Sequence, residues 1–353
     1  MQTCNTCGFV EKDDSSLFCQ NCGNSLRETN NQMNQPRVSF INQRTIKKSV
    51  TNGKTVVIVF GVAFLLIALV IGGLFVGLYN NSFTYTKIGE RTYSEPLDSV
   101  KEISFDFTNS LGNYFIKSGI GLNDAFSINQ AVSSTNGNAQ LGDSTEVIVN
   151  NVNGSVSITF DANQNSFSSQ NFKYDFVISV NIEVPIKNIN LFTQTGSIDS
   201  MFQNQTIYSF KEVSNTGTVT TSFIDCSFMD GLTGVSTSTG YIQFDLESPS
   251  FYSNRTWDIG TSTGSITSNI KISNMSNYEQ KFDIHASTGS VNLNRSYKNN
   301  PFETITARVS TGSISFNNID QVGKTFSNNN GNTNSPLILH FNLETSTGDI
   351  HIN

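Results

Sequence analysis

The stretch Asp258-Ile-Gly-Thr-Ser-Thr-Gly-Ser-Ile266 decides the fold, because its Thr-Gly pair recurs along the second half of the chain. The copies are Thr195-Gly196, Thr216-Gly217, Thr239-Gly240, Thr263-Gly264, Thr288-Gly289, Thr311-Gly312 and Thr347-Gly348. Successive glycines are 21, 23, 24, 25, 23 and 36 residues apart. Glycine supplies the positive φ of a tight turn, and a threonine before it can bond its own backbone. Each copy therefore predicts a turn.

Apolar side chains alternate on both sides of every turn. Two residues after the glycine the chain always has a branched aliphatic residue: Ile198, Val219, Ile242, Ile266, Val291, Ile314 and Ile350. Five residues before it stand Leu191, Glu212, Val235, Ile259, Ile284, Ala307 and Leu343. Seven residues before it stand Ile189, Phe210, Thr233, Trp257, Phe282, Ile305 and Phe341. This period of two predicts that each copy forms a strand, a turn and a second strand with one buried face. Glu212 and Thr233 are polar residues at apolar positions, so we expect their copies to be irregular.

A period of 21–25 residues with one turn motif is typical of a β-solenoid, in which stacked coils share a core. Gly154 and Gly112 extend the series upstream in steps of 42 residues, which is two periods. About 11 coils, spaced ~4.8 Å apart, would then fill residues 100–353. The 36-residue last step predicts a surface loop, which either covers the open end of the stack or is flexible. A β-sandwich of short strands is the competing interpretation.

One segment ahead of the turns makes a family resemblance specific. The strand Tyr174-Asp-Phe-Val-Ile-Ser-Val-Asn-Ile-Glu-Val-Pro185 ends in a Val-Pro pair, and the later turns read STGSI, STGSV and STGDI. This combination resembles the adhesin domain of bacteria and archaea that is also called the toastrack domain, best over 170–353 and less over 100–169. The resemblance implies a β-solenoid-like envelope domain, often joined to transmembrane helices and sometimes to cytoplasmic signalling modules. It carries no catalytic residues over.

A long apolar segment precedes this domain. Residues 55–79 contain no charge and follow Lys54. As a helix they would measure roughly 37 Å, enough to cross a hydrocarbon core of about 30 Å. A cleaved signal peptide does not fit, because 54 residues precede the segment. We therefore expect a single transmembrane helix at 54–79.

The charges give this helix an orientation. Arg37, Arg44, Lys47, Lys48 and Lys54 lie on its N-terminal side, which the positive-inside rule places in the cytoplasm. Residues 80–353 carry 14 Lys and Arg against 24 Asp and Glu, so they lack the basic surface that nucleic acid requires. We expect an extracytoplasmic domain at 100–353. Polar residues 27–53 predict a flexible basic linker, and 80–99 a second linker.

Four of the five cysteines lie in the first 22 residues, as the pairs Cys4-Asn-Thr-Cys7 and Cys19-Gln-Asn-Cys22. Two C-x-x-C turns can direct four thiolates at one Zn²⁺, so residues 1–26 predict a zinc ribbon with a closed, structural site. A domain this small needs the metal to fold. Two disulfides or a rubredoxin-like iron are the alternatives, and a reducing cytoplasm disfavours the disulfides.

Candidate catalytic residues are few. We expect the alternation to turn His285 and His351 outward, and Cys226 to be a small buried residue. Asp283, Glu303, Glu344 and Asp349 could line one face across coils, as in a calcium site or a polysaccharide-active β-helix enzyme. No repeated aspartate run supports that arrangement, so we expect no enzyme.

Two functions remain from the sequence. The first is a membrane-anchored surface protein whose outer domain binds a cell-surface polymer or an envelope protein, as an adhesin does. The second is a transmembrane sensor whose zinc ribbon contacts a cytoplasmic protein partner. The intact ribbon favours the second, because an adhesin alone needs no cytoplasmic module.

Overall fold

The computed structural model describes residues 2–3, 10–11, 85–119, 123–162, 172–274, 276–298, 300–317, 319–321, 325–331 and 335–353. The chain separates into two compact units, Met1–Asn80 and Asn81–Asn353. In the first unit β1 (Gln2–Thr3) pairs antiparallel with β2 (Val10–Glu11). The four predicted zinc ligands, the basic linker and the predicted helix at 54–79 lie outside the described residues. Within the described part, no helix is long and apolar enough to cross a membrane.

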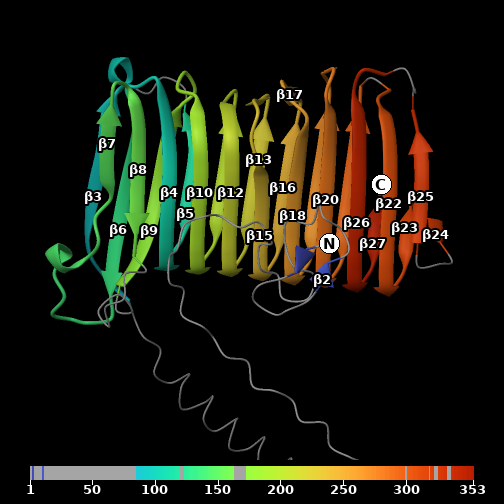
Figure 1. Ribbon diagram of the computed structural model, residues 1–353. Coiled ribbons are helices and arrows are strands. Elements are labelled where there is room, and N and C mark those ends of the chain that lie inside the picture. The colour runs from blue at the N-terminus through green and yellow to red at the C-terminus, as the bar shows by residue number, and fades with distance from the viewer. Residues whose placement is uncertain are drawn as a thin grey trace, which may run out of the picture. The chain divides into compact units, whose positions relative to one another are not determined.

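The second unit is mainly β and consists of two large sheets (Figure 1). The first sheet contains β4 (Glu102–Leu111), β7 (Ile148–Val152), β8 (Ser155–Asp161), β10 (Ile186–Thr195), β12 (Thr206–Thr216), β14 (Ser227–Phe228), β15 (Thr233–Thr239), β17 (Ser250–Phe251), β18 (Arg255–Thr263), β20 (Glu279–Thr288), β22 (Phe302–Thr311), β25 (Thr325–Asn330) and β26 (Ile338–Thr347). The second contains β3 (Thr86–Pro96), β5 (Tyr114–Gly119), β6 (Asp124–Ser134), β9 (Phe172–Asn181), β11 (Ile198–Gln203), β13 (Val219–Ile224), β16 (Ile242–Glu247), β19 (Ile266–Ile272), β21 (Val291–Tyr297), β23 (Ile314–Phe316), β24 (Ile319–Gln321) and β27 (Ile350–Ile352). Two short 3-10 helices are η1 (Leu97–Ser99) and η2 (Leu141–Asp143).

Each repeat forms one coil of a parallel stack. A longer strand of the first sheet runs into the Thr-Gly turn, and a shorter strand of the second sheet leaves it. Neighbouring coils pair in register, so that Ile198 lies beside Val219 and Val219 beside Ile242. The period therefore predicted a stack of parallel coils correctly, and the competing β-sandwich of short strands is wrong.

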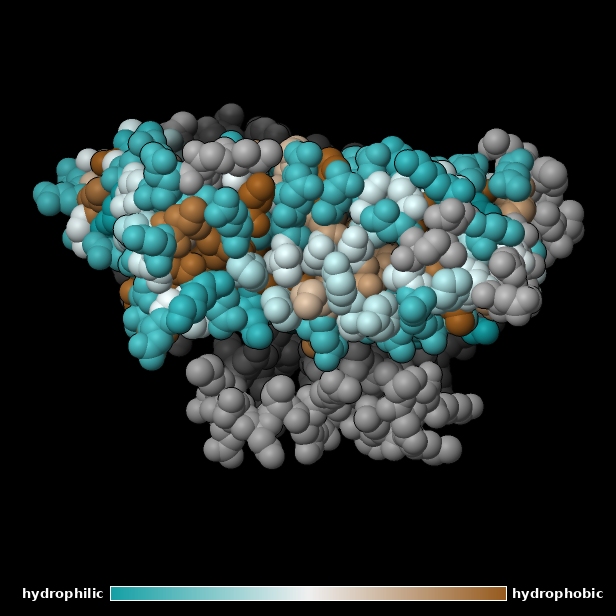
Figure 2. Space-filling view, turned by 90° about the horizontal axis from the view of Figure 1, so that it is seen from above, coloured by the Kyte–Doolittle hydropathy of each residue, from teal (hydrophilic) through white to brown (hydrophobic). Residues whose placement is uncertain are grey.

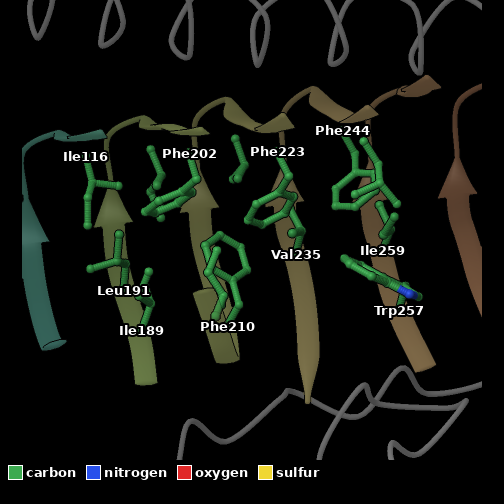
Figure 3. Close-up of a cluster of buried hydrophobic side chains, with 14 of the residues drawn as sticks. Ile116, Ile189, Leu191, Phe202, Phe210, Phe223, Val235, Phe244, Trp257 and Ile259 are labelled. Atoms are coloured by element: carbon green, nitrogen blue, oxygen red, sulfur yellow. The ribbon is translucent and has the colours of Figure 1, made fainter. Parts of the chain in front are cut away.

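The predicted inward positions form the core between the sheets (Figure 3). The aliphatic residues two places after each glycine are at most 1% exposed, and so are nearly all residues five and seven places before it. Glu212 and Thr233 are buried as well, and β12 pairs with β10 and β15 without a register shift. The copy with Glu212 is regular, against expectation, because the hydroxyls of Ser200 and Thr221 accommodate its carboxyl group. The copy with Thr233 is irregular, as expected: Ile207 pairs with Phe228 and Phe210 with Thr233, so this copy has extra residues between β14 and β15. The Thr233 hydroxyl accepts a hydrogen bond from Arg255.

The Thr-Gly turns stack directly on one another. Gly240 has a φ of 154°, and a Cβ built on it would lie 1.9 Å from the carbonyl oxygen of Gly217. The glycine carbonyl also accepts a hydrogen bond from the next coil, where Thr237 Oγ1 donates to Gly217 O at 3.2 Å. Glycine is thus required for both its φ and its lack of a side chain.

The coils do not follow chain order at the C-terminal end. β26 lies between β20 and β22, and β27 between β21 and β23, so the last repeat lies between the two repeats that precede it in the sequence. Ring stacking favours this order, since Phe341 stacks on Phe282 with ring centroids 4.9 Å apart. The long last step holds β24 and β25, which run antiparallel to β23 and β22 at the ends of the two sheets. The prediction that this segment covers the end of the stack is confirmed.

The N-terminal end departs further from the expected series. The Gly112 turn lies directly beside the Gly196 turn, with Gly112 N donating to Thr195 O at 3.0 Å. Gly154, with Asn153, turns the antiparallel hairpin of β7 and β8. The described part therefore holds eight Thr-Gly-type turns, at Gly112 and the seven glycines above, and the figure of about 11 coils is wrong. Residues 86–99, expected within a linker, instead form β3 and η1, because β3 pairs with β6.

Glu212 is a carboxylic acid in the interior of the stack. Glu212 is fully buried and accepts hydrogen bonds from Ser200 Oγ and Thr221 Oγ1. Burial raises its pKa to about 8, because the core solvates the charged form poorly. The pKa of Glu212 is therefore higher in the folded chain than in the unfolded chain. The contribution of Glu212 to the stability of the fold is complete below the unfolded pKa and is lost as the pH rises through about 8.

We expect Gly240→Ala to lower the free energy of unfolding by more than about 2 kcal/mol, because the new methyl group meets a backbone oxygen at a positive φ. Thermal unfolding followed by circular dichroism measures this. The matched control is Gly137→Ala, where a Cβ meets nothing within 4 Å. Equal stability of the two variants would contradict the backbone-contact explanation.

We expect Glu212→Gln to raise the stability of the folded chain at pH 8, by an amount on the order of 4 kcal/mol, and to give no gain near pH 4. The amide removes the buried charge and keeps an acceptor oxygen. Unfolding curves across pH 4–9 test this. The exposed Glu344→Gln serves as the control, with an effect within about 0.5 kcal/mol. A Glu212→Gln gain that does not grow with pH would show that charge burial is not the cause.

Candidate functional site

A row of amide side chains crosses the outer face of the second sheet. In β16 the core residues Phe244 and Leu246 point inward, so Asp245 between them faces outward. Asn269 of β19 and Asn294 of β21 occupy the same position in the next two coils. Asn353, directly after β27, follows them. We call Asp245, Asn269, Asn294 and Asn353 the amide ladder.

Hydrogen bonds join each rung of the amide ladder to the next. Asn269 Nδ2 donates to Asp245 Oδ1 at 2.5 Å, Asn294 Nδ2 to Asn269 Oδ1 at 2.8 Å, and Asn353 Nδ2 to Asn294 Oδ1 at 3.0 Å. Gln243 Nε2 donates to the other oxygen, Asp245 Oδ2, at 2.8 Å. An ionised carboxylate can only accept, so Asp245 sets the direction of the whole row.

The amide ladder keeps unused hydrogen-bonding capacity. A side-chain amide carries two N–H donors and two lone pairs on its oxygen. The described bonds use one donor and one lone pair of Asn269 and of Asn294. Each of these rungs therefore offers one donor and one acceptor, held in place, at intervals of about 4.8 Å.

A groove of about 470 Å³ runs beside the amide ladder. Its lining comes from β13, β16, β19 and β21 and consists of Ser222, Ile224, Asp245, Leu246, Glu247, Asn269, Lys271, Asn294, Arg295 and Ser296. Its exposed charges are matched, since Lys271 Nζ lies 3.6 Å from Glu247 Oε2. This volume falls in the range of ligand-binding clefts.

A buried ion pair fixes the last rung. Arg295 Nε lies 2.7 Å from Glu303 Oε1, which also accepts a hydrogen bond from Tyr297 Oη at 2.6 Å. Arg295 Nη1 donates to the carbonyl oxygen of Asn353 at 2.8 Å. Burial and the neighbouring Glu303 carboxylate raise the pKa of Tyr297 well above its usual range, so this phenol remains protonated.

The candidate catalytic residues do not come together. Asp283 and Glu344 lie on the outer face of the first sheet, Glu303 is buried in the core, and Asp349 accepts hydrogen bonds from Ser313 at a Thr-Gly turn. Asp283 and Glu344 thus share a face in adjacent coils, whereas Glu303 and Asp349 occupy other positions of the coil, so the four residues do not line one face as the sequence suggested.

His285 and His351 point outward, as expected, and the described histidines have separate partners. His285 Nδ1 is 3.6 Å from Asp258 Oδ1, and its side chain is half exposed. His340 contacts Thr304 and Glu279, and His351 contacts Ser315. Burial raises the pKa of Asp258, and the nearby His285 opposes that rise. Among the described residues, no three His, Cys, Asp or Glu side chains are placed to share a metal ion.

Cys226 is buried, as predicted. Its Sγ donates to Phe202 O and Ile224 O, each at 3.4 Å. Burial raises the pKa of the thiol to about 12, so it stays protonated and unreactive.

Figure 2 shows one side of the second unit, which is mostly hydrophilic, with apolar side chains gathered toward the left of the view. On the first sheet, Asn190 Nδ2 donates to Asp106 Oδ1 and Asn342 Nδ2 to Asp283 Oδ1, both at 2.7 Å. These are isolated rungs, whereas the second sheet joins three in series beside a groove. The amide ladder and its groove are therefore the candidate site. The apolar period of the sequence marks only the inward positions, and the residues of the amide ladder lie at outward ones, so the period did not predict this site.

Comparisons with known proteins add little. No family model matches the chain, and no curated protein matches it. Two solved structures are similar: a candidate cell adhesion protein from Clostridium sporogenes, 12% identical at a TM-score of 0.32 over 76% of this chain and 99% of its own, and a candidate adhesin from Bacteroides fragilis, 11% identical at 0.33 over 75% and 96%. These scores are too low to carry a functional inference, so the proposed function rests on the residues of this chain.

Proposed function

We propose that the chain is a single-pass membrane protein whose coil stack lies outside the cell and binds surface polymers, as an adhesin does. The observation that carries this proposal is the amide ladder beside its groove. Side chains held by mutual hydrogen bonds lose little further freedom on binding, which favours recognition.

The membrane anchor is the segment 54–79, with the N-terminus in the cytoplasm. Its 25 uncharged residues and the basic residues before it support this topology. Anchoring many copies in one membrane lets weak individual contacts act together, since a second contact is made at a high effective concentration. A shallow polar groove suits such a role.

The cytoplasmic end carries a structural zinc ribbon held by Cys4, Cys7, Cys19 and Cys22. The pairing of Gln2 with Glu11 and of Thr3 with Val10 supports it, because these strands bracket the segment with Cys4 and Cys7. This module favours a second function, in which a polymer bound outside is reported to a cytoplasmic protein. Clustering of the anchored chains would suffice, since a flexible tether transmits no force.

We expect the purified full chain, reconstituted in liposomes, to sediment with isolated cell envelopes. The double variant Asn269→Ala, Asn294→Ala should bind less, because two rungs are lost. Asn190→Ala, which removes an isolated rung on the first sheet, should bind like the wild type. Absence of binding to every envelope tested would refute the surface-binding function.

We expect one zinc ion for each full chain by elemental analysis. Cys4→Ser should lose it, because three thiolates leave the tetrahedral site incomplete. Cys226→Ser should retain it, since Cys226 is buried in the other unit. A chain without zinc, or equal zinc in both variants, would exclude the ribbon.

A further inference from the structure

We propose that the groove beside the amide ladder binds an uncharged linear polysaccharide that runs across the strands, along the stack. This inference rests on the proposed surface-binding function and specifies the ligand class. Three features of the site carry it: its hydrogen-bonding pattern, its charge and its closed backbone.

The hydrogen-bonding pattern suits hydroxyl groups. Asn269 and Asn294 each offer one free donor beside one free acceptor. A single hydroxyl group can accept a hydrogen bond from the donor and donate one to the acceptor. The pattern repeats from coil to coil at about 4.8 Å, so a ligand must present hydroxyls repeatedly along a line. Ser222 and Ser296 add hydroxyls to the lining, and Ile224 adds an apolar surface for the C–H face of a sugar ring.

The charge of the site disfavours an acidic polymer. Lys271 is paired with Glu247, and Arg295 is committed to Glu303 and to the Asn353 carbonyl. The charge of each cation in the lining is therefore already balanced by a carboxylate of the protein. Asp245 and the excess of acidic residues in 80–353 repel such groups further. An uncharged chain meets no such penalty.

The closed backbone disfavours a protein strand. The groove crosses β13, β16, β19 and β21, and each of these strands pairs with neighbours on both sides. Their N–H and C=O groups are consumed between coils, so an added strand would find no backbone edge there. Only side chains are therefore available to bind a ligand in the groove. From β13 to β21 the lining spans roughly 15 Å, which accommodates a short run of sugar rings rather than one ring.

The test measures binding of the liposome-reconstituted full chain to soluble linear β-glucan and mannan, with polygalacturonate as the acidic polymer, and to envelopes treated with periodate or with protease. We expect a neutral glycan to bind and polygalacturonate not to. Periodate, which cleaves sugar diols, should abolish envelope binding, and protease should leave it. The double variant Asn269→Ala, Asn294→Ala should weaken glycan binding at least about tenfold, and Asn190→Ala should not.

Each contrary outcome identifies what fails. Binding to envelopes that protease abolishes and periodate spares would replace the polysaccharide with a protein partner, and would leave the surface-binding function standing. Polygalacturonate binding that the double variant weakens would show that the groove accepts an acidic polymer, and would also overturn the inference. The inference would also be overturned if the chain bound envelopes after periodate treatment and bound neither neutral glycan. No envelope binding at all would remove the proposed function with it.

Discussion

The structure depends on the contact between one backbone turn and the next. In each coil after the first, the glycine of the Thr-Gly turn lies against a glycine carbonyl of a neighbouring coil, at a distance that excludes any side chain. This contact fixes the spacing and the register of the two strands that meet at the turn. Once the glycines are in line, every residue at a given distance from them is in line as well. The core and the outer rows follow from that single constraint.

The interior is less uniform than the turns. Two buried polar side chains find partners in their own and in neighbouring coils: Ser200 and Thr221 bind Glu212, and backbone carbonyls and Thr233 bind Arg255. Arg255 also lies over the rings of Phe228 and Trp257, which lower the cost of burying a cation. Because neighbouring coils are in register, a polar side chain in one coil can be satisfied from the next without disturbing either strand.

The sequence predicted the features that follow from the repeat period. It did not predict which strands pair where two partners are similar. The turn glycines and the inward residues were readable, because glycine and the alternation of apolar residues are local signals. The insertion of β26 between β20 and β22 was not, since Phe341 and Ile305 suit the same core row and only their packing against Phe282 distinguishes them. The turn at Gly154 was wrongly predicted to be a coil turn, whereas it joins the two strands of a hairpin. A lone glycine carries no information on whether its flanking strands pair with each other or with a neighbouring coil. The amide ladder could have been found from Asp245, Asn269 and Asn294, which stand five residues after successive turn glycines.

The same register that builds the core also builds the candidate site. A stack places equal positions of successive repeats side by side, so a preference for Asn or Asp at one outward position becomes a continuous row. Apolar residues at the inward positions form a continuous core by the same rule. The carboxylate of Asp245 at one end and the Arg295-held Asn353 at the other give that row a direction and two fixed ends. A directional row of paired donors and acceptors is matched best by a ligand that repeats too, and this favours a polymer over a small molecule.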